Sequence, residues 1–286
     1  MFTANPGSGV ALAPHIGWYI ILYFFLGGLA GGLMMIAAML RLVGDPKDHD
    51  AVRIAHRLAF PLIVVCTLLL IIDLGTPIRF WHMVFKSERF PALLLKPWSP
   101  ISLGVWILTI YAGVAFVDYF FPDRIRHRAW TILGGLTGLA LAGYTGVFLT
   151  ATSIAPWHNA RLLGALFLLS GMSSAYALLI LLLPADVTTQ RKLATGDFWT
   201  VSIEALVLVL MLIGLGSLGR VFWSGWLFGV IFWIGVVGLG LLAPLARHWF
   251  SFDRRRAAWF ALTGGLLLRF VIIMSPQYPR VPLWHL

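Results

Sequence analysis

The segment from Ile71 to Phe85, IIDLGTPIRFWHMVF, places proton-exchanging side chains at the end of an apolar run. Asp73 ends that run, and Arg79 and His82 follow it within nine residues. Carboxylate and imidazole groups accept and release protons, and a nearby guanidinium favours the ionised carboxylate. The pattern therefore predicts proton-exchange chemistry at the mouth of a hydrophobic helix.

Other polar side chains fall in or beside long apolar runs, namely His15, Tyr144, Glu204 and Arg269. Ionisable groups within membrane helices are costly, and they usually face a cavity or a partner. We therefore expect some of these groups to bind a ligand or to carry protons. Glu204, about five residues inside its apolar run, either joins a proton path or extends its carboxylate to the interface.

The elements that must position these groups are membrane helices. The chain has 286 residues, of which 60% are hydrophobic and 11% are charged, and its mean hydropathy is +0.89. A soluble domain has about 25% charged residues. The apolar residues occur in repeated runs of about 20, and each run is long enough to cross about 30 Å of hydrocarbon as a helix. The composition predicts an all-α, polytopic membrane protein.

Hydropathy predicts eight spans, which are separated by Pro and charge clusters such as GDPKDHD, FPDRIRHR and SFDRRR. The spans cover residues 17–40, 55–74, 101–120, 130–151, 162–184, 199–218, 225–246 and 257–275. The N-terminal segment MFTANPGSGVALAPH has no positive charge before the first run. We therefore expect the first run to be a retained span rather than a cleaved signal peptide.

Positive charge predicts the orientation of the spans. The first, third, fifth and seventh connections carry 13 Lys and Arg residues, with Arg57 counted in the first, whereas the second, fourth and sixth carry six. By the positive-inside rule the odd connections are cytoplasmic, and both termini lie outside. The long second connection, residues 76–100, is an exception because it faces outward and is nevertheless basic.

This orientation brings polar groups from four spans to one outer layer. Tyr144 and Arg269 each lie about 20 Å along an outward-running span at 1.5 Å per residue. Asp73 ends the second span, and His15 precedes the first. One interpretation of this layer is a ligand site. The other is an ion pair of Asp73 with Arg269 or Arg79 that stabilises the bundle, and both can hold at once.

Residues that would hold metals or haem are scarce. Cys66 is the single cysteine, which excludes disulfide frameworks, Cys-ligated iron–sulfur clusters and zinc ribbons within the chain. The eight histidines fall in predicted loops or at span ends, whereas haem-binding anchors place histidines deep between helices. We expect no haem and no metal in this chain. The net charge of +10 is attributed to loops that fix orientation rather than to nucleic-acid binding.

Five segments, DLGTPIRFWHM, WSPISLGVW, YTGVFLTATSIAPWHNA, GGLLLRFVII and YFFLGGLAGGLMM, resemble the NrfD family, the polysulfide-reductase-type membrane subunits. The first four resemble signature segments, and the last resembles the first helix of the family. They occur in family order and span nearly the whole chain. The resemblance implies eight helices as two four-helix bundles, residues 1–151 and 152–286, in a bacterial-type inner membrane.

The resemblance also implies a haem-free quinone pocket near the outer face of the first bundle. In the family, a histidine before the first helix and the tyrosine of the YTG segment contact the quinone, and these positions match His15 and Tyr144. Asp73 matches the carboxylate of the DLG segment and is a candidate proton acceptor. The further candidates beside the menaquinone or ubiquinone headgroup are Arg79, His82 and Arg269.

We therefore expect the quinone-reactive membrane subunit of an oxidoreductase complex, with an iron–sulfur subunit and a molybdopterin catalytic subunit as partners. The iron–sulfur subunit is expected to dock on the outer face through the basic residues of the second connection, Arg79, Lys86, Arg89 and Lys96. Alternatively, this connection lies in the lipid interface. The alternative functions are a purely structural anchor and an ion or proton translocator. Scarce intramembrane charge counts against transport.

Overall fold

The chain folds into a set of membrane-length helices. The computed structural model describes residues 16–75, 96, 98–121, 127–184, 188–246 and 253–277, and within these ranges every ordered element is a helix. Eight of the helical segments have the length and hydropathy needed to cross a membrane, which confirms the predicted all-α, eight-span character.

The helices follow one another in the order of the predicted spans. The first half contains α1 (Trp18–Val43), η1 (Pro46–Asp48), α2 (His49–Asp73), α3 (Pro100–Phe120) and α4 (Arg128–Thr150). The middle contains α5 (Ala155–His158), α6 (Leu163–Leu182), α7 (Thr188–Leu215), η5 (Gly216–Gly219) and α8 (Arg220–Trp223). The last part contains α9 (Trp226–Val230), the π-helical η6 (Ile231–Leu242), α10 (Ala243–Ala246), α11 (Arg254–Met274) and η7 (Ser275–Gln277).

Two helices begin earlier than hydropathy predicts. Helix α2 begins at His49 rather than at residue 55, and α7 begins at Thr188 rather than at residue 199. The first turns of both helices carry polar side chains, which a hydropathy scan assigns to a loop. In α7 two of these side chains are buried, Thr189 and Gln190, and the Gln190 amide donates to the Leu183 carbonyl oxygen at 2.9 Å. Hydrogen-bonded burial therefore extends the helix beyond its apolar part.

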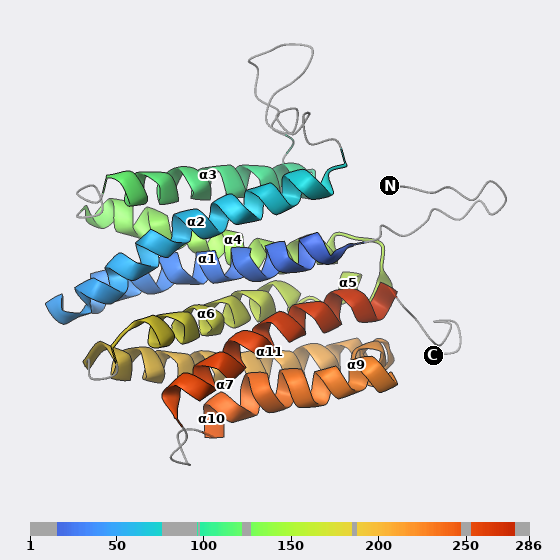
Figure 1. The fold of residues 1–286 in the computed structure, drawn as a ribbon. Coiled ribbons are helices and arrows are strands. Elements are labelled where there is room, and N and C mark those ends of the chain that lie inside the picture. The colour runs from blue at the N-terminus through green and yellow to red at the C-terminus, as the bar shows by residue number, and fades with distance from the viewer. Residues whose placement is uncertain are drawn as a thin grey trace, which may run out of the picture.

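Helix α1 lies at the centre of the helix array (Figure 1) and packs against α2, α4, α6 and α11. Its GGLAGG segment permits close approach on two sides. A Cβ atom on Gly31 would lie 2.5 Å from the carbonyl oxygen of Gly138 in α4, and one on Gly32 would lie 2.6 Å from that of Gly171 in α6. Larger residues would push the neighbouring backbones apart, so these small residues set the position of α1 between α4 and α6.

The helices form two closed sets of contacts. In the first set α1 packs on α2, α2 on α3, α3 on α4, and α4 on α1. In the second set α6 packs on α7, α7 on η6, η6 on α11, and α11 on α6. The two sets are joined by further contacts of α6 with α1 and α4 and of α11 with α1. The division into domains at residues 151 and 152 stays a prediction.

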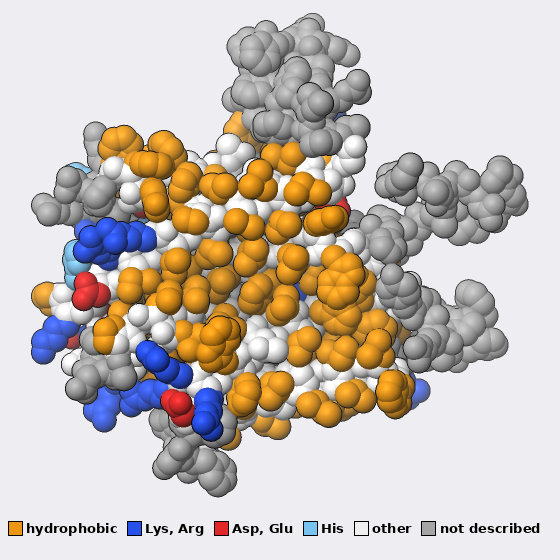
Figure 2. Space-filling model, in the orientation of Figure 1, with side chains coloured by type: hydrophobic (Ala, Val, Ile, Leu, Met, Phe, Trp, Pro, Cys, Tyr) orange, Lys and Arg blue, Asp and Glu red, His pale blue; other side chains and the backbone are white. Residues whose placement is uncertain are grey.

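Charge is distributed unevenly between the two ends of the helix array. Figure 2 shows a broad hydrophobic band over the helices, with most Lys and Arg side chains at one end. That end carries Lys47, Arg53, Arg57, Arg128, Arg191, Lys192, Arg254, Arg255 and Arg256. The described cations at the opposite end are Lys96, Arg161 and Arg220. This asymmetry is the one on which the predicted orientation depends, and the sides of the termini stay a prediction.

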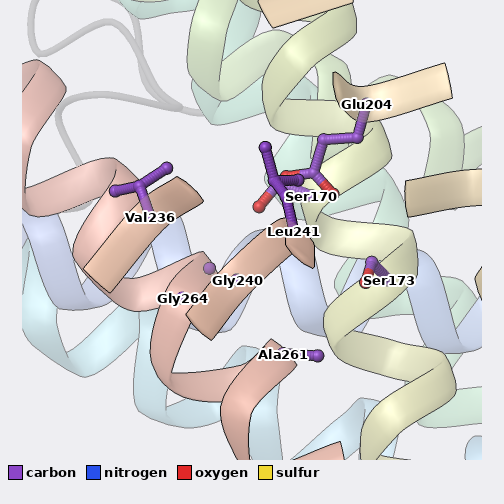
Figure 3. A pocket seen from close by; sticks show the side chains of 9 residues that line it. Ser170, Ser173, Glu204, Val236, Gly240, Leu241, Ala261 and Gly264 are labelled. Carbon is purple, nitrogen blue, oxygen red and sulfur yellow. The ribbon is translucent and has the colours of Figure 1, made fainter. Parts of the chain in front are cut away.

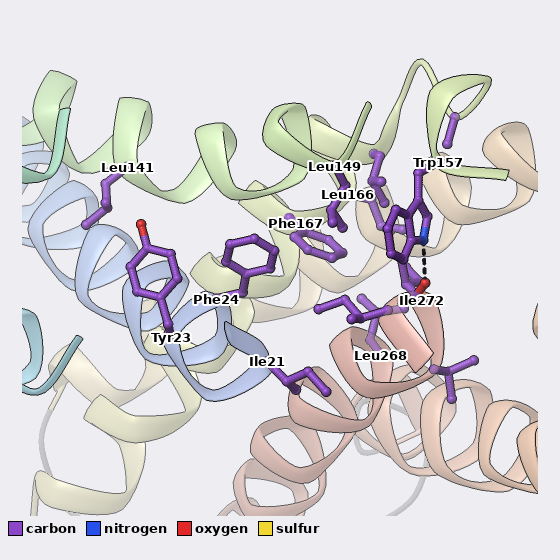
Figure 4. Close-up of a cluster of buried hydrophobic side chains, with 14 of the residues drawn as sticks. Ile21, Tyr23, Phe24, Leu141, Leu149, Trp157, Leu166, Phe167, Leu268 and Ile272 are labelled. Carbon is purple, nitrogen blue, oxygen red and sulfur yellow. Dashed lines mark hydrogen bonds between the residues drawn. The ribbon is translucent and has the colours of Figure 1, made fainter. Parts of the chain in front are cut away.

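The connection between α4 and α6 is tied to the last helix by a buried tryptophan. Trp157 in α5 has no exposed surface, and its indole Nε1 donates to the carbonyl oxygen of Ile272 in α11 at 2.7 Å (Figure 4). In a regular helix that carbonyl accepts from the amide of the residue four positions later, which here is Pro276 and has no N–H. The indole therefore supplies the donor that Pro276 lacks.

Candidate functional site

A cavity of about 310 Å³ lies among the first four spanning helices. Its walls are mostly aliphatic and aromatic, with five polar side chains among them. The lining residues are Ile20, Tyr23 and Phe24 of α1; Thr67, Leu70, Ile71, Asp73 and the adjacent Leu74 of α2; Ile101, Gly104, Val105, Leu108 and Thr109 of α3; and Tyr144 and Phe148 of α4. An apolar cavity with a few polar groups is the usual form of a small-molecule site. It brings together two of the predicted site residues, Asp73 and Tyr144.

Tyr144 projects from α4 and lies against α3. Its hydroxyl donates to the carbonyl oxygen of Pro100, the first residue of α3. In a regular helix this carbonyl also accepts from the backbone amide of Gly104, so it keeps a partner if the tyrosine hydroxyl turns away. The Tyr144 hydroxyl is therefore satisfied here, and it can move to another acceptor in the cavity at low cost.

The place of the Tyr144 ring depends on Gly104. A Cβ atom on Gly104 would lie closer than 3.0 Å to the hydroxyl oxygen and to two ring carbons of Tyr144. Carbon atoms in contact are normally about 3.5–4.0 Å apart, so no other residue leaves the ring where it is. The sequence pattern WSPISLGVW contained this glycine, but hydropathy and spacing gave it no role.

Asp73 is the last residue of α2 and lies on the wall of the cavity with its side chain exposed. A Cβ atom on Gly17 would lie 4.0 Å from Oδ1 of Asp73, so the N-terminal end of α1 meets the end of α2 here. The free N–H groups at the start of a helix favour a nearby anion. Asp73 therefore combines access to water with a place on the cavity wall, as proton exchange requires.

Arg269 lies in α11 with no exposed surface. Its guanidinium donates to the carbonyl oxygens of Phe24 and Phe167, both at 3.1 Å, and to the hydroxyl of Ser170 at 3.2 Å. These contacts join α1, α6 and α11. The expected pair with Asp73 is not among them, and Arg269 does not line the cavity. Arg269 is linked to the cavity by its hydrogen bond to the carbonyl oxygen of Phe24, which is one of the lining residues.

Glu204 of α7 is 5% exposed and lines a second, small cavity among α6, α7, η6 and α11 (Figure 3). The volume of this cavity is about 10 Å³, which is near the minimum for one water molecule. The positive charge of Arg269 attracts the Glu204 carboxylate, and Ser170 lies between the two side chains. Ser173, on the same cavity wall, donates its hydroxyl to Asp197 at 3.0 Å. Because Glu204 is enclosed in this network, it does not extend to the lipid interface.

A polar cluster absent from the sequence predictions lies at the other end of the first four helices. Nδ1 of His56 in α2 is 2.9 Å from Oδ2 of Asp118 in α3, and Oδ1 of Asp118 accepts from the Trp130 indole of α4 at 2.5 Å. His56 and Asp118 are both buried. Hydropathy predicts His56 at a span end, but α2 begins at His49, so His56 lies two turns inside the helix.

Three predicted site residues, His15, Arg79 and His82, lie outside the described residues. The same holds for most of the basic second connection. The structure describes four of its residues, Lys96, Trp98, Ser99 and Pro100, and of these Lys96 and Trp98 are exposed. The predicted docking surface is therefore not tested by the described part of the chain.

Comparison with known proteins gives consistent matches over nearly the whole chain. The family model described as polysulphide reductase, NrfD, matches residues 13–279. Protein NrfD of Escherichia coli is 27% identical over 91% of this chain and 94% of its own length. A polysulfide reductase chain of Wolinella succinogenes is 28% identical over 91% of this chain and 93% of its own length. A selenate reductase subunit of Mesobacillus selenatarsenatis is 23% identical over 94% of this chain and 75% of its own length.

Proposed function

Because the chain belongs to the polysulphide reductase NrfD family, we propose that it is the quinone-reactive membrane subunit of an oxidoreductase complex. It is an integral membrane protein with eight helices able to span a bilayer, and its relatives include single subunits of polysulfide and selenate reductases. The proposed reaction is exchange of two electrons and two protons with menaquinone or ubiquinone. We place it in a bacterial inner membrane, as two four-helix bundles with both termini outside.

The observation that carries this proposal is the cavity of about 310 Å³ among α1, α2, α3 and α4. A quinone headgroup needs hydrogen-bond partners at its carbonyl oxygens, within walls that accept an apolar ring. Tyr144 is the proposed donor to one carbonyl. Binding exchanges its present acceptor, the Pro100 carbonyl, for the quinone oxygen, and neither group is left without a partner.

Proton exchange is assigned to Asp73. When a quinol is oxidised, each hydroxyl releases a proton as its electrons leave, and reduction takes the same protons up. A carboxylate on the cavity wall with an exposed side chain connects the headgroup with water. His15, Arg79 and His82 remain proposed contributors to the same site on the grounds of sequence alone.

Electrons require a partner, since we expect no haem or metal centre in this chain. We propose that an iron–sulfur subunit docks on the outer face over the second connection and links the quinone site to a molybdopterin catalytic subunit. The names of the relatives support a complex, because each names one component of a reductase with several subunits. The basic residues of the second connection favour an acidic partner surface.

A proton path through Glu204 is a second proposal, and the buried network favours it. Asp197, Ser173, Glu204 and Ser170 lie in order between the cation-rich end of α7 and Arg269, around a cavity large enough for about one water molecule. Arg269 in turn bonds to the carbonyl of Phe24, which lines the first cavity.

The test of the quinone site is Tyr144→Phe, with Tyr119→Phe as the matched control. Tyr119 lies on α3, is 43% exposed and does not line the cavity. Each variant is purified with its complex, and oxidation of a quinol analogue is measured. We expect Tyr144→Phe to slow turnover several-fold with assembly intact, and Tyr119→Phe to behave as wild type. Unchanged quinol kinetics in assembled Tyr144→Phe complexes would remove Tyr144 from the site.

A further inference from the structure

Three sides of the cavity are closed by direct helix contact. Between α1 and α4, the rings of Phe24 and Phe148 meet edge to face with their centroids 6.2 Å apart. Between α1 and α2, the thiol of Cys66 lies 3.9 Å from the carbonyl oxygen of Tyr23. Between α3 and α4, the ring of Tyr144 covers Gly104. A ligand cannot pass between these helix pairs without separating them.

The fourth side, between α2 and α3, is different among the described residues. The lining residues of α2 on this side, Leu70 and Ile71, are half-buried. On α3 the side chain of Ile101 is 54% exposed, Val105 is half-buried and Thr109 is exposed. The cavity wall therefore reaches the outer surface of the molecule between these two helices.

This opening lies within the apolar band. From Ile101 to Thr109 it follows nine residues of α3, which span about 12 Å from the first to the last. The outward faces beside it carry Ile72 on α2 and Leu103 and Ile110 on α3, which are 54%, 43% and 50% exposed. In a bilayer these residues face acyl chains, so the opening connects the cavity with the lipid interior rather than with water.

The chemistry of the opening suits an apolar chain. Among the described residues, Thr109 is the polar side chain of the opening, and Thr67 lies near it on the cavity wall. Both donate their hydroxyl protons to carbonyl oxygens of their own helices, Thr67 to Ile63 at 2.8 Å and Thr109 to Val105 at 2.7 Å. The opening therefore has no donor that an apolar chain would leave unsatisfied. Tyr144 lies across the cavity on α4, on the side where a headgroup would bind.

We propose that the isoprenoid tail of the quinone leaves the cavity between α2 and α3, through an opening lined by Leu70, Ile71, Ile101, Val105 and Thr109. This inference rests on the proposed quinone site and extends it. The tail continues from this opening into the surrounding lipid.

The test narrows the opening and compares two substrates. Ile101→Trp and Thr109→Trp each place a large ring at an exposed position of the opening. Leu103→Trp and Ile110→Trp place the same ring at exposed positions of the same helix that do not line the cavity. Each variant is purified with its complex, and turnover is measured with a long-tailed quinol and with a tailless quinol analogue.

We expect both opening variants to lose roughly tenfold or more in kcat/KM for the long-tailed quinol, since the tail loses its apolar contacts. Turnover of the tailless analogue should stay near that of wild type, and the control variants should be unaffected with both substrates. Equal turnover of the long-tailed quinol in opening and control variants would overturn the inference. Loss of both substrates in assembled opening variants also overturns it, because these side chains would then act on the headgroup. Failure of the wild-type complex to react with either quinol would instead refute the proposed quinone site.

Discussion

The substitution Gly104→Ala tests whether close packing of α3 against Tyr144 shapes the quinone site. The new Cβ atom would lie closer than 3.0 Å to the hydroxyl oxygen and two ring carbons of Tyr144. Normal carbon contacts are about 3.5–4.0 Å, so the ring or the helix must shift by at least about 0.5 Å. The hydroxyl then loses its geometry toward the Pro100 carbonyl, or the ring moves into the cavity.

The expected cost can be divided into two parts. Overpacking of a tight contact costs about 1–3 kcal/mol, and the lost hydrogen bond costs about 1 kcal/mol more. If half of this total cost is lost from the binding free energy of the quinone, the affinity falls by roughly tenfold. The matched control is Gly113→Ala on the same helix, where a Cβ atom meets nothing within 4 Å.

The assay is the Kd of a quinol analogue for the purified complex, together with the amount of the chain in the membrane fraction. We expect Gly104→Ala to bind the analogue weakly and Gly113→Ala to bind it as wild type does. Gly104→Ala combined with Tyr144→Leu should restore the amount of protein, because the clash is gone, but not the affinity, because the hydroxyl is gone. Wild-type affinity in a normally assembled Gly104→Ala complex would refute the packing argument.

Three further perturbations address other parts of the molecule. Asp73→Asn removes the exchangeable proton at nearly constant side-chain size. Over a pH range of about 5 to 8 the rate of quinol oxidation should therefore be lower than in wild type, while the quinol analogue still binds, and the exposed Asp50→Asn serves as the control. Full activity over that range would leave Asp73 a structural role only. Arg269→Met removes the donors to the carbonyl oxygens of Phe24 and Phe167 and takes the positive charge away from the buried Glu204. The free energy of unfolding should fall by about 3–5 kcal/mol, and adding Glu204→Gln should recover part of that loss. An unchanged thermal unfolding midpoint would contradict this expectation. Trp157→Phe leaves the Ile272 carbonyl without a donor, since residue 276 is proline, and should lower the free energy of unfolding by about 1–3 kcal/mol. The control Trp259→Phe, at a 62% exposed position, should lower it little. Thermal unfolding of both variants measures the difference.

The architecture was predictable because hydropathy acts over a whole helix. Runs of about 20 apolar residues specify spanning helices regardless of which partners they meet, so eight spans followed from the sequence. The early starts of α2 and α7 did not follow from it. Gln190 and Thr189 are polar, yet they are buried because carbonyl and carboxylate groups on neighbouring elements accept their protons. A scan along one chain segment does not contain those partners.

The candidate site was predictable only in part, for a related reason. Asp73 and Tyr144 meet at one cavity because both lie near the same end of the bundle, which depth counting captures. The role of Gly104 depends on which face of α3 meets α4, and one sequence does not specify that face. His56 and Asp118 lie 62 positions apart, and only the antiparallel packing of α2 on α3 brings them together.

Arg269 explains why two carboxylates in one membrane protein can serve different purposes. Depth alone placed Arg269 near Asp73, but its guanidinium is fixed by Phe24, Phe167 and Ser170 and faces Glu204. Glu204 is buried beside it, with Ser170 between the two side chains, so its carboxylate is enclosed by the protein. Asp73 is instead placed at an exposed helix end beside the start of α1. Direct proton exchange with water needs a carboxylate that water reaches, whereas a relay inside the protein needs an enclosed one, and for that reason the two roles fall on two residues rather than on one.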